Sequence, residues 1–367
     1  MIYLDYQATT PLAPEVRAAM LPWFDRFANP HSPSRWGREA AAAIEHARGQ
    51  VASCLPPGGE VLFTSGATEA INWALTGVRS PDRDKLVTIA TEHAAVLDSV
   101  AALRRDGWDV TVLPVGGDGL VRLADVKAAV DERTLLVAAM LVNNEIGVVQ
   151  PVAEIAGIAH AAGALLLCDT VQGFGRMAVP DGPDLIAACA HKVHGPKMVG
   201  ALWVRDGLRL EPLLHGGGQE RGLRSGTLSP MLCVGFGAAA ALAAERREAD
   251  AEHVGRLWTV AKEALGPGWQ VNGSTEQRYR GNLNIRRGGL DSPRLLADLR
   301  DVAFSLGSAC ASGSGRPSHV LRALGLSDKE ARSSIRLGFG RYTTEAELTE
   351  ACRRIAGAAE AQRHLPA

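Results

Sequence analysis

The stretch DLIAACAHKVHGPKMVGALWV, residues 184–204, decides how the chain folds. Its first part, 185–190, is a short apolar run of small residues that predicts a buried strand. A Gly-Pro turn at 195–196 follows, and a second apolar run at 200–204 predicts a strand buried on both faces. Lys192 therefore lies between a buried element and a forced turn, where partial desolvation lowers the pKa of its amine. This placement is typical of a Schiff-base lysine, although an ordinary solvated lysine at a strand end fits the stretch equally well.

The composition is that of a globular protein, and it excludes several classes of function. The 367 residues are 46% hydrophobic and 22% charged, with a formal net charge of -1, and this length suggests two domains. Charges of one sign form no sustained run, so we expect no direct nucleic-acid partner and no membrane-surface partner. The chain shows no export signal and no apolar stretch of membrane-spanning length, which predicts a cytoplasmic protein. Its six cysteines lack zinc-site spacing, so we expect reduced thiols and no metal site.

Strands and helices alternate through the first two thirds of the chain. This order predicts an α/β fold with a mostly parallel central sheet covered by helices, and ligands of such sheets bind beyond the carboxyl ends of the strands. Strand after strand ends in a polar side chain: Thr64, His93, Asn144, Asp169 and the pair His191-Lys192. Each could be an ordinary satisfied polar residue, but together they predict one ligand site. Asp169 follows an apolar strand and needs a cation or a donor, which a protonated pyridine nitrogen would supply.

A turn of small polar residues, TSGATE at 64–69, joins an expected strand to an expected helix. Turns of this kind present backbone N–H groups and hydroxyls to an anionic group, usually a phosphate. The same residues could also be no more than a helix cap.

Beyond Pro267 the pattern changes to short strands and helices, which predicts a smaller α+β domain completed by the N-terminal segment. We expect a large domain at 15–250 and a small domain made of 1–14 and 251–367. Cys310 lies here on a run of Gly, Ser and Ala that should be mobile, so it is a candidate nucleophile, whereas most free cysteines are buried small hydrophobes. Arg336, in a strand downstream, could hold a substrate carboxylate or form a structural ion pair.

With these residues assembled, the chain closely resembles the cysteine desulfurases of the NifS/IscS type. These are fold-type I pyridoxal-phosphate (PLP) enzymes of the class V aminotransferase group. The matching stretches follow the family order along nearly the whole chain: YLDYQATTPLAP (3–14), FTSGATEA (63–70), TEHAAVL (91–97), VNNEIGVVQP (142–151), CDTVQ (168–172), HKVHGPK (191–197), HGGGQERGLRSGTL (215–228), GSACAS (307–312) and SSIRLGFGR (333–341).

The resemblance implies PLP as the cofactor, L-cysteine as the substrate and L-alanine as the product. It implies Lys192 as the Schiff-base lysine, His93 as a ring-stacking proton relay and Cys310 as the nucleophile that takes the sulfur as a persulfide. Arg336 and Asn144 would bind the substrate, and the sulfur would pass to an acceptor protein in iron–sulfur cluster assembly or a thiolation pathway. The cofactor-binding residues that it implies are Ala67, Thr68, Asn144, Asp169, Gln172, Cys189, His191, Lys192 and, from the other subunit of a homodimer, Thr227.

The chain departs from the family pattern at three places. Cys189 stands where the family usually has a serine, and a thiol is a weaker hydrogen-bond donor to phosphate than a hydroxyl. The stretch 167–170, LCDT, replaces a usual His-x-Asp-Ala and changes the surroundings of Asp169. The chain also ends soon after its last expected helix, whereas longer members carry a tail that helps to dock an iron–sulfur scaffold, so the acceptor stays open.

Two alternative functions remain at this stage. A selenocysteine lyase, or another class V PLP enzyme, would share the fold but would not need Cys310. A non-catalytic assembly protein would bind partners only, and the joint presence of Lys192, Asp169, His93 and Cys310 argues against it.

Overall fold

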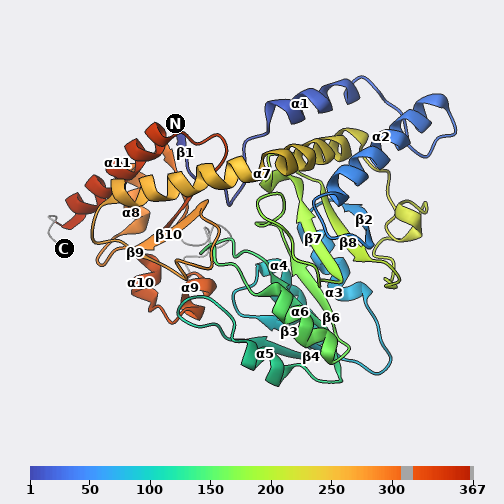
Figure 1. Ribbon diagram of the computed structural model, residues 1–367, viewed down its shortest axis with the longest axis horizontal. Coiled ribbons are helices and arrows are strands. Elements are labelled where there is room, and N and C mark those ends of the chain that lie inside the picture. The colour runs from blue at the N-terminus through green and yellow to red at the C-terminus, as the bar shows by residue number, and fades with distance from the viewer. Residues whose placement is uncertain (307–316, 364–367) are drawn as a thin grey trace.

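The computed structural model describes residues 1–306 and 317–363 (Figure 1). Its largest sheet has the strand order β2-β8-β7-β6-β5-β3-β4, and two small sheets pair β1 with β11 and order β12-β10-β9. The strands are β1 (Ile2–Tyr3), β2 (Gly59–Thr64), β3 (Lys85–Ile89), β4 (Asp109–Leu113), β5 (Thr134–Met140), β6 (Leu165–Asp169), β7 (Leu185–Cys189), β8 (Gly200–Arg205), β9 (Gln270–Val271), β10 (Asn282–Arg286), β11 (Val302–Ala303) and β12 (Ser334–Gly338).

Helices cover the sheets and join their strands. The α-helices are α1 (Pro14–Met20), α2 (Arg35–Ala52), α3 (Ala67–Gly77), α4 (Ala94–Arg105), α5 (Leu123–Ala129), α6 (Val152–Ala161), α7 (Pro230–Leu265), α8 (Ser292–Asp298), α9 (His319–Ala323), α10 (Asp328–Arg332) and α11 (Glu345–Arg363). Short 3₁₀ turns occur at η1 (Leu21–Trp23), η2 (Ala190–Lys192) and η3 (Glu220–Gly222).

Strand direction in the large sheet explains where the polar strand ends meet. Neighbouring strands are parallel from β4 through β3, β5 and β6 to β7. β8 is antiparallel to both β7 and β2, so β2 has the same direction as β7. β8 is thus the one reversed strand of this sheet, and the carboxyl ends of the others lie along one edge. The prediction of a mostly parallel sheet is confirmed.

Two hydrophobic layers sandwich the large sheet, as the alternation of side chains along each strand requires. On one face α3 and α4 pack against residues such as Leu62, Leu167 and Leu202. On the other face α1, α2 and α7 pack against Phe63 and Trp203 near the β2 end of the sheet. Helices α5 and α6 cover the same face nearer to β3 and β5.

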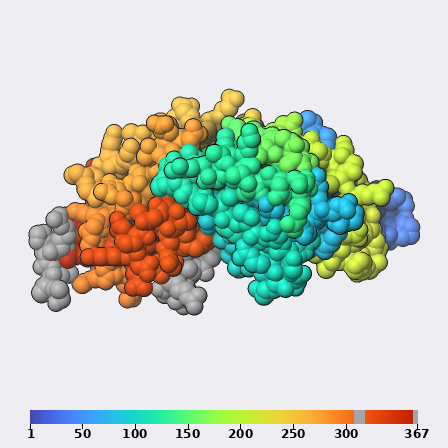
Figure 2. All heavy atoms as spheres, turned by 90° about the horizontal axis from the view of Figure 1, so that it is seen from below, coloured from blue at the N-terminus to red at the C-terminus, as the bar shows by residue number. Residues whose placement is uncertain are grey.

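A separate core fills the C-terminal part of the chain and includes the N-terminal strand region. Leu4 packs there with residues of α7, β10, β12 and α11, among them Leu257, Leu337 and Ile355. In Figure 1 the helix α7 extends from the large sheet to the small sheet of β10 and β12. Figure 2 shows the orange and red C-terminal residues at one end of an elongated molecule. Because α7 continues unbroken past residue 250, the domain boundaries stay a prediction.

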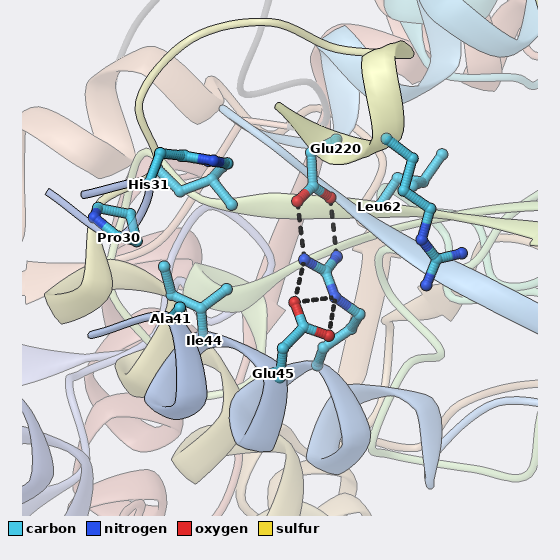
Figure 3. Close-up of a pocket in the computed structure, with 10 residues that line it drawn as sticks. Pro30, His31, Ala41, Ile44, Glu45, Leu62 and Glu220 are labelled. Carbon is cyan, nitrogen blue, oxygen red and sulfur yellow. Dashed lines mark hydrogen bonds and ion pairs between the residues drawn. The ribbon is translucent and has the colours of Figure 1, made fainter. Parts of the chain in front are cut away.

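A buried ion pair fixes the turn that follows the Gly-rich loop at 215–218. Glu220, whose side chain is only 2% exposed, accepts two hydrogen bonds of 2.7 Å from Arg48 and one of 2.7 Å from the backbone N–H of Phe63. Glu220 and Arg221 both have positive φ, at 46° and 59°, which costs about 1–3 kcal/mol for each non-glycine residue. The ion pair stabilises this turn against that cost. Figure 3 shows the dashed contacts of Glu220 and Glu45, with Pro30 and His31 across the same cavity.

Replacing Glu220 by alanine should destabilise the protein, because it leaves the Arg48 guanidinium and the Phe63 N–H without their buried acceptor. We expect a loss of about 3–5 kcal/mol, measured as a lower thermal midpoint. Glu45→Ala is the matched control, since Glu45 binds the same guanidinium with a side chain that is 62% exposed, and it should cost at most about 1 kcal/mol. Equal shifts in the two variants would contradict this view of the turn.

Candidate active site

A cavity of about 730 Å³ lies at the carboxyl edge of the large sheet, a size typical of small-molecule sites. Its lining includes residues from the ends of β5, β6 and β7 together with Arg336 from β12 of the small sheet. The predicted site residues that it brings together are Ala67, Thr68, His93, Asn144, Asp169, Gln172, Cys189, His191, Lys192 and Arg336. Thr227 is not among the lining residues of this chain's own cavity, and Cys310 lies outside the described residues.

Lys192 ends the short turn η2, directly after the buried strand β7. Its Nζ donates hydrogen bonds to the backbone carbonyls of Gln7 and, at 2.7 Å, of Ala8. The segment around Thr10 holds this turn from the other side, because the Thr10 N–H donates to the carbonyl of His191 at 3.0 Å. Lys192 therefore points its amine into the cavity from a backbone that the N-terminal segment clamps.

Asp169 ends β6 and is only 6% exposed. Burial raises the pKa of its carboxyl, while the hydrogen bond from the Val171 N–H and the positive charge of Lys192 lower it. Its Oδ1 accepts a hydrogen bond of 2.9 Å from the backbone N–H of Val171, which fixes the carboxyl plane. A buried carboxylate with this orientation can bind a cationic ring N–H in the cavity.

His93 caps the N-terminus of α4, and the Ala95 N–H donates to its Nδ1 at 3.1 Å. A neutral imidazole that accepts at Nδ1 carries its proton on Nε2. The neighbouring Glu92 is fully buried, and burial raises the pKa of its carboxyl well above the usual value. Its Oε1 accepts a hydrogen bond of 2.7 Å from the Met140 N–H, which acts against the effect of burial.

The N-terminus of α3 offers backbone N–H groups at the cavity wall, where Ala67 and Thr68 lie. The preceding Gly66 approaches β8 very closely, since a Cβ added to Gly200 would lie 2.6 Å from the carbonyl carbon of Gly66. Only glycine at position 200 permits this contact. The N-terminus of a helix that faces a cavity in this way is suited to a phosphate.

Two further side chains near this wall are held in neutral form. Burial and the charge of Lys192 lower the pKa of His191 to about 4, so its imidazole is neutral at pH 7, with Nδ1 3.2 Å from the Thr9 hydroxyl. Burial raises the pKa of Cys189 to about 12, so its thiol stays protonated. Both can donate a hydrogen bond to a phosphate without adding negative charge beside it.

Gln172 and Asn144 are each held by neighbouring residues, two of which, Gln7 and Arg336, line the same cavity. Gln172 donates to the carbonyl of Gln7 at 3.0 Å and accepts from Arg176 at 2.6 Å. The carbonyl of Asn144 accepts hydrogen bonds from Asn282 at 3.2 Å and from Arg336 at 3.1 Å. These contacts hold the side chain of Gln172 and the backbone of Asn144.

The sequence assigned no individual role to Gln7, Ala8 and Thr9, which line the same cavity. Ser65 and Glu69, which also line it, were predicted only as members of the turn at 64–69. The carboxylate of Glu69 accepts from the Ser65 N–H at 2.9 Å and from Arg224 at 2.8 Å, which lowers its pKa against the opposing effect of burial. The signal available for the first three residues was the family-like stretch at 3–14, which contains them.

The sequence matches the family model described as aminotransferase class-V over residues 2–350. The chain belongs to this family. A cysteine desulfurase IscS of Rickettsia bellii (strain OSU 85-389) is 43% identical over 368 residues, which cover 96% of this chain and 90% of the relative. Among solved structures, a NifS-like protein superposes with a TM-score of 0.90 at 32% identity, covering 98% of this chain and 99% of that chain. SspA in complex with cysteine superposes with a TM-score of 0.84 at 34% identity, covering 94% and 100%.

Membership of the class-V aminotransferases confirms the predicted fold type, enzyme class and cofactor, pyridoxal 5′-phosphate. Within residues 1–306 and 317–363, every helix is too short or too polar to cross a bilayer. The individual roles of the site residues stay predictions.

Cys189→Ser should tighten the binding of PLP modestly, because a hydroxyl donates a stronger hydrogen bond to phosphate than a thiol does. One neutral hydrogen bond contributes about 0.5–1.5 kcal/mol, so we expect an affinity gain of roughly ten-fold at most. A titration of PLP release from the wild type and the variant measures this gain. Weaker binding in the serine variant would show that Cys189 does not face the phosphate.

Proposed function

We propose that this chain is a cysteine desulfurase, which converts L-cysteine to L-alanine and carries the released sulfur as a persulfide on Cys310. The observation that carries the proposal is the convergence of Lys192, Asp169 and Arg336 on one cavity. The IscS relatives and the cysteine complex of SspA support the same substrate. The sulfur then passes to an acceptor protein that serves iron–sulfur cluster assembly or a thiolation pathway.

The residues around the cavity fit PLP. Ala67, Thr68, Cys189 and His191 would hold its phosphate, and Asp169 would hold the protonated pyridine nitrogen. Gln172 and Asn144 would lie by its phenolic oxygen, with His93 stacked on the ring. When bound, the cofactor supplies an electron sink for the bond that breaks at the substrate Cα.

The chain's own groups would then move the protons and the sulfur. Lys192, which would attach the cofactor, would also remove the Cα proton of the substrate, and His93 would relay protons through Nε2. The Cys310 thiolate attacks the substrate sulfur, so that the carbon–sulfur bond breaks, a sulfur–sulfur bond forms and the alanine carbon gains a proton. Arg336 binds the substrate carboxylate.

The functional unit in this proposal is a homodimer. Thr227 does not line its own chain's cavity, so a role at the phosphate requires a second subunit. Large apolar side chains lie exposed close together in sequence, with Leu21, Phe24, Phe27 and Trp36 at 50%, 67%, 86% and 62%. Phe27 and Trp36 pack edge to face, with ring centroids 5.7 Å apart. An apolar surface of this kind is typical of a contact between proteins, and we assign it to a second copy of the chain.

Cys310→Ser separates the desulfurase from a selenocysteine lyase. The variant should bind PLP, change its absorbance on addition of cysteine, release no sulfide and carry no persulfide. Sulfide release by Cys310→Ser at nearly the wild-type rate would favour the lyase.

Lys192→Ala should lose both turnover and the borohydride-reducible attachment of the cofactor. A borohydride-reducible attachment that remains in Lys192→Ala would show that another lysine binds the cofactor.

Mixed dimers test whether Thr227 acts across the subunit contact. Thr227→Ala alone should lower the affinity for PLP by about ten-fold, since it removes one charge-assisted hydrogen bond. The mixed dimer of Thr227→Ala with Lys192→Ala is assayed at a PLP concentration too low to load Thr227→Ala. Action across the contact leaves one site with both groups intact, so turnover should reach about half of the wild-type value. Action within one subunit would leave both sites defective, and the mixed dimer would then be no better than Thr227→Ala.

A further inference from the structure

Arg336 is held by an acidic and a hydroxyl side chain that no part of the proposed mechanism uses. Its side chain is 1% exposed, and its Nη2 donates to Asp5 Oδ1 at 2.8 Å and to Ser305 Oγ at 2.9 Å. Ser305 Oγ in turn donates to the same Asp5 oxygen at 2.8 Å. The other end of the guanidinium, Nη1, donates to the carbonyl of Asn144 at 3.1 Å.

We propose that Asp5, supported by Ser305, is a positioning residue that aims Arg336 at the carboxylate of the amino-acid substrate. The inference rests on the role of Arg336 in the proposed function. Asp5 acts on the substrate only through Arg336, so it affects substrates that carry a carboxylate and not those that lack one.

Main-chain hydrogen bonds fix the positions of Asp5, Ser305 and Arg336 relative to one another. Ser305 and Arg336 face each other in a bridge with N–O distances of 3.1 and 2.7 Å. Asp5 pairs with Gly338 on the same strand, and the Gly338 N–H donates to the carbonyl of Leu4 at 2.7 Å. Glycine is favoured at 338, because a Cβ there would lie 2.8 Å from the backbone nitrogen of Tyr6 and 1.8 Å from the Gln7 side-chain oxygen. The acidic group is therefore fixed relative to Arg336 by the backbone.

The guanidinium depends on these partners for its orientation. Its Nε is buried and has no hydrogen-bond partner among the described residues, so the side-chain contacts of Asp5 and Ser305 and the carbonyl of Asn144 set its plane. A buried guanidinium also needs a counter-charge, which Asp5 supplies at 18% exposure. With Nη2 taken by Asp5 and Ser305, the remaining N–H directions are fixed before the substrate arrives.

Orientation and charge predict opposite effects when Asp5 is changed, which makes the inference testable. Removal of a negative charge beside Arg336 should, by charge alone, strengthen the binding of a carboxylate. Loss of the fixed orientation should weaken it. Asp5→Asn removes the charge and keeps an acceptor oxygen at the same place, whereas Asp5→Ala removes both.

The experiment compares equilibrium binding of L-alanine and of ethylamine, which lacks the carboxylate, to PLP-loaded enzyme by cofactor absorbance. In Asp5→Ala we expect the Kd of L-alanine to rise about 10- to 100-fold, with the Kd of ethylamine within about two-fold. The KM for L-cysteine should rise in parallel while kcat changes less. Asp5→Asn should stay within about three-fold for both ligands. Asp301→Ala, which breaks an exposed ion pair with Arg354 in the same part of the molecule, is the matched control and should change neither ligand.

Three results would overturn the inference. They are an equal loss for both ligands in Asp5→Ala, unchanged or tighter L-alanine binding in that variant, and an Asp5→Asn variant as weak as Asp5→Ala. Ser305→Ala gives a second test if Asp5→Ala does not fold, with an expected loss of about two- to five-fold for L-alanine alone. Arg336→Ala distinguishes failure of the proposed function from failure of this inference. If Arg336→Ala still prefers L-alanine over ethylamine, Arg336 is not the carboxylate anchor. If Arg336→Ala loses this preference but Asp5→Ala keeps it, Arg336 is the anchor and Asp5 does not position it.

Discussion

The site depends on main-chain hydrogen bonds that tie the N-terminal segment to both halves of the molecule at once. On one side the N–H groups of Thr10 and Ala13 donate to the carbonyls of His191 and His194, each at 3.0 Å, which clamps the turn that carries the lysine. On the other side Leu4 and Asp5 pair with the strand that carries Arg336. A segment of about ten residues thus sets the separation between the amine of Lys192 and the guanidinium of Arg336, and the rest of each half packs around these fixed points.

Burial raises the pKa of several acidic and thiol groups close to this cavity. It raises the pKa of Glu145 to about 7, and the Ser318 hydroxyl at the start of α9 donates a hydrogen bond to Glu145. Burial also raises the pKa of Glu92 well above its usual value and that of Cys189 to about 12. Lys192, Lys197 and Arg336 bring positive charge to the cavity wall, which suits anionic groups such as phosphate and carboxylate, and the carboxyl groups of Glu69 and Asp169 lie on the same wall. The cost is that ionising Glu145 above pH 7 places an extra negative charge beside the site.

The polar strand ends were predictable because each follows a short apolar run, as Asp169 and Lys192 do, and because parallel strands end at one edge. The last expected helix of the chain is also present, as α11 at Glu345–Arg363. The two-residue strands β9 and β11 carry too little periodicity to be seen, and so does the five-residue helix α10. Contacts such as Asp5 with Arg336 join residues far apart along the chain and leave no local pattern. The positive φ of Glu220 is likewise invisible, since its cause is a distant arginine.

The pairing of the first strand with the last part of the chain also has a consequence for the order of assembly. Ile2 pairs with Val302 in β11, 300 residues further along the chain, and Asp5 pairs with Gly338 in β12, 333 residues further along. Contacts of such long range form late, because closing a long loop costs entropy before any contact rewards it. The pairing that places Asp5 beside Arg336 therefore forms only after β12 has been synthesised, whereas the contacts of Thr10 and Ala13 with the lysine turn need the chain only as far as His194. Until β12 is present, the Arg336 side of the cavity is incomplete.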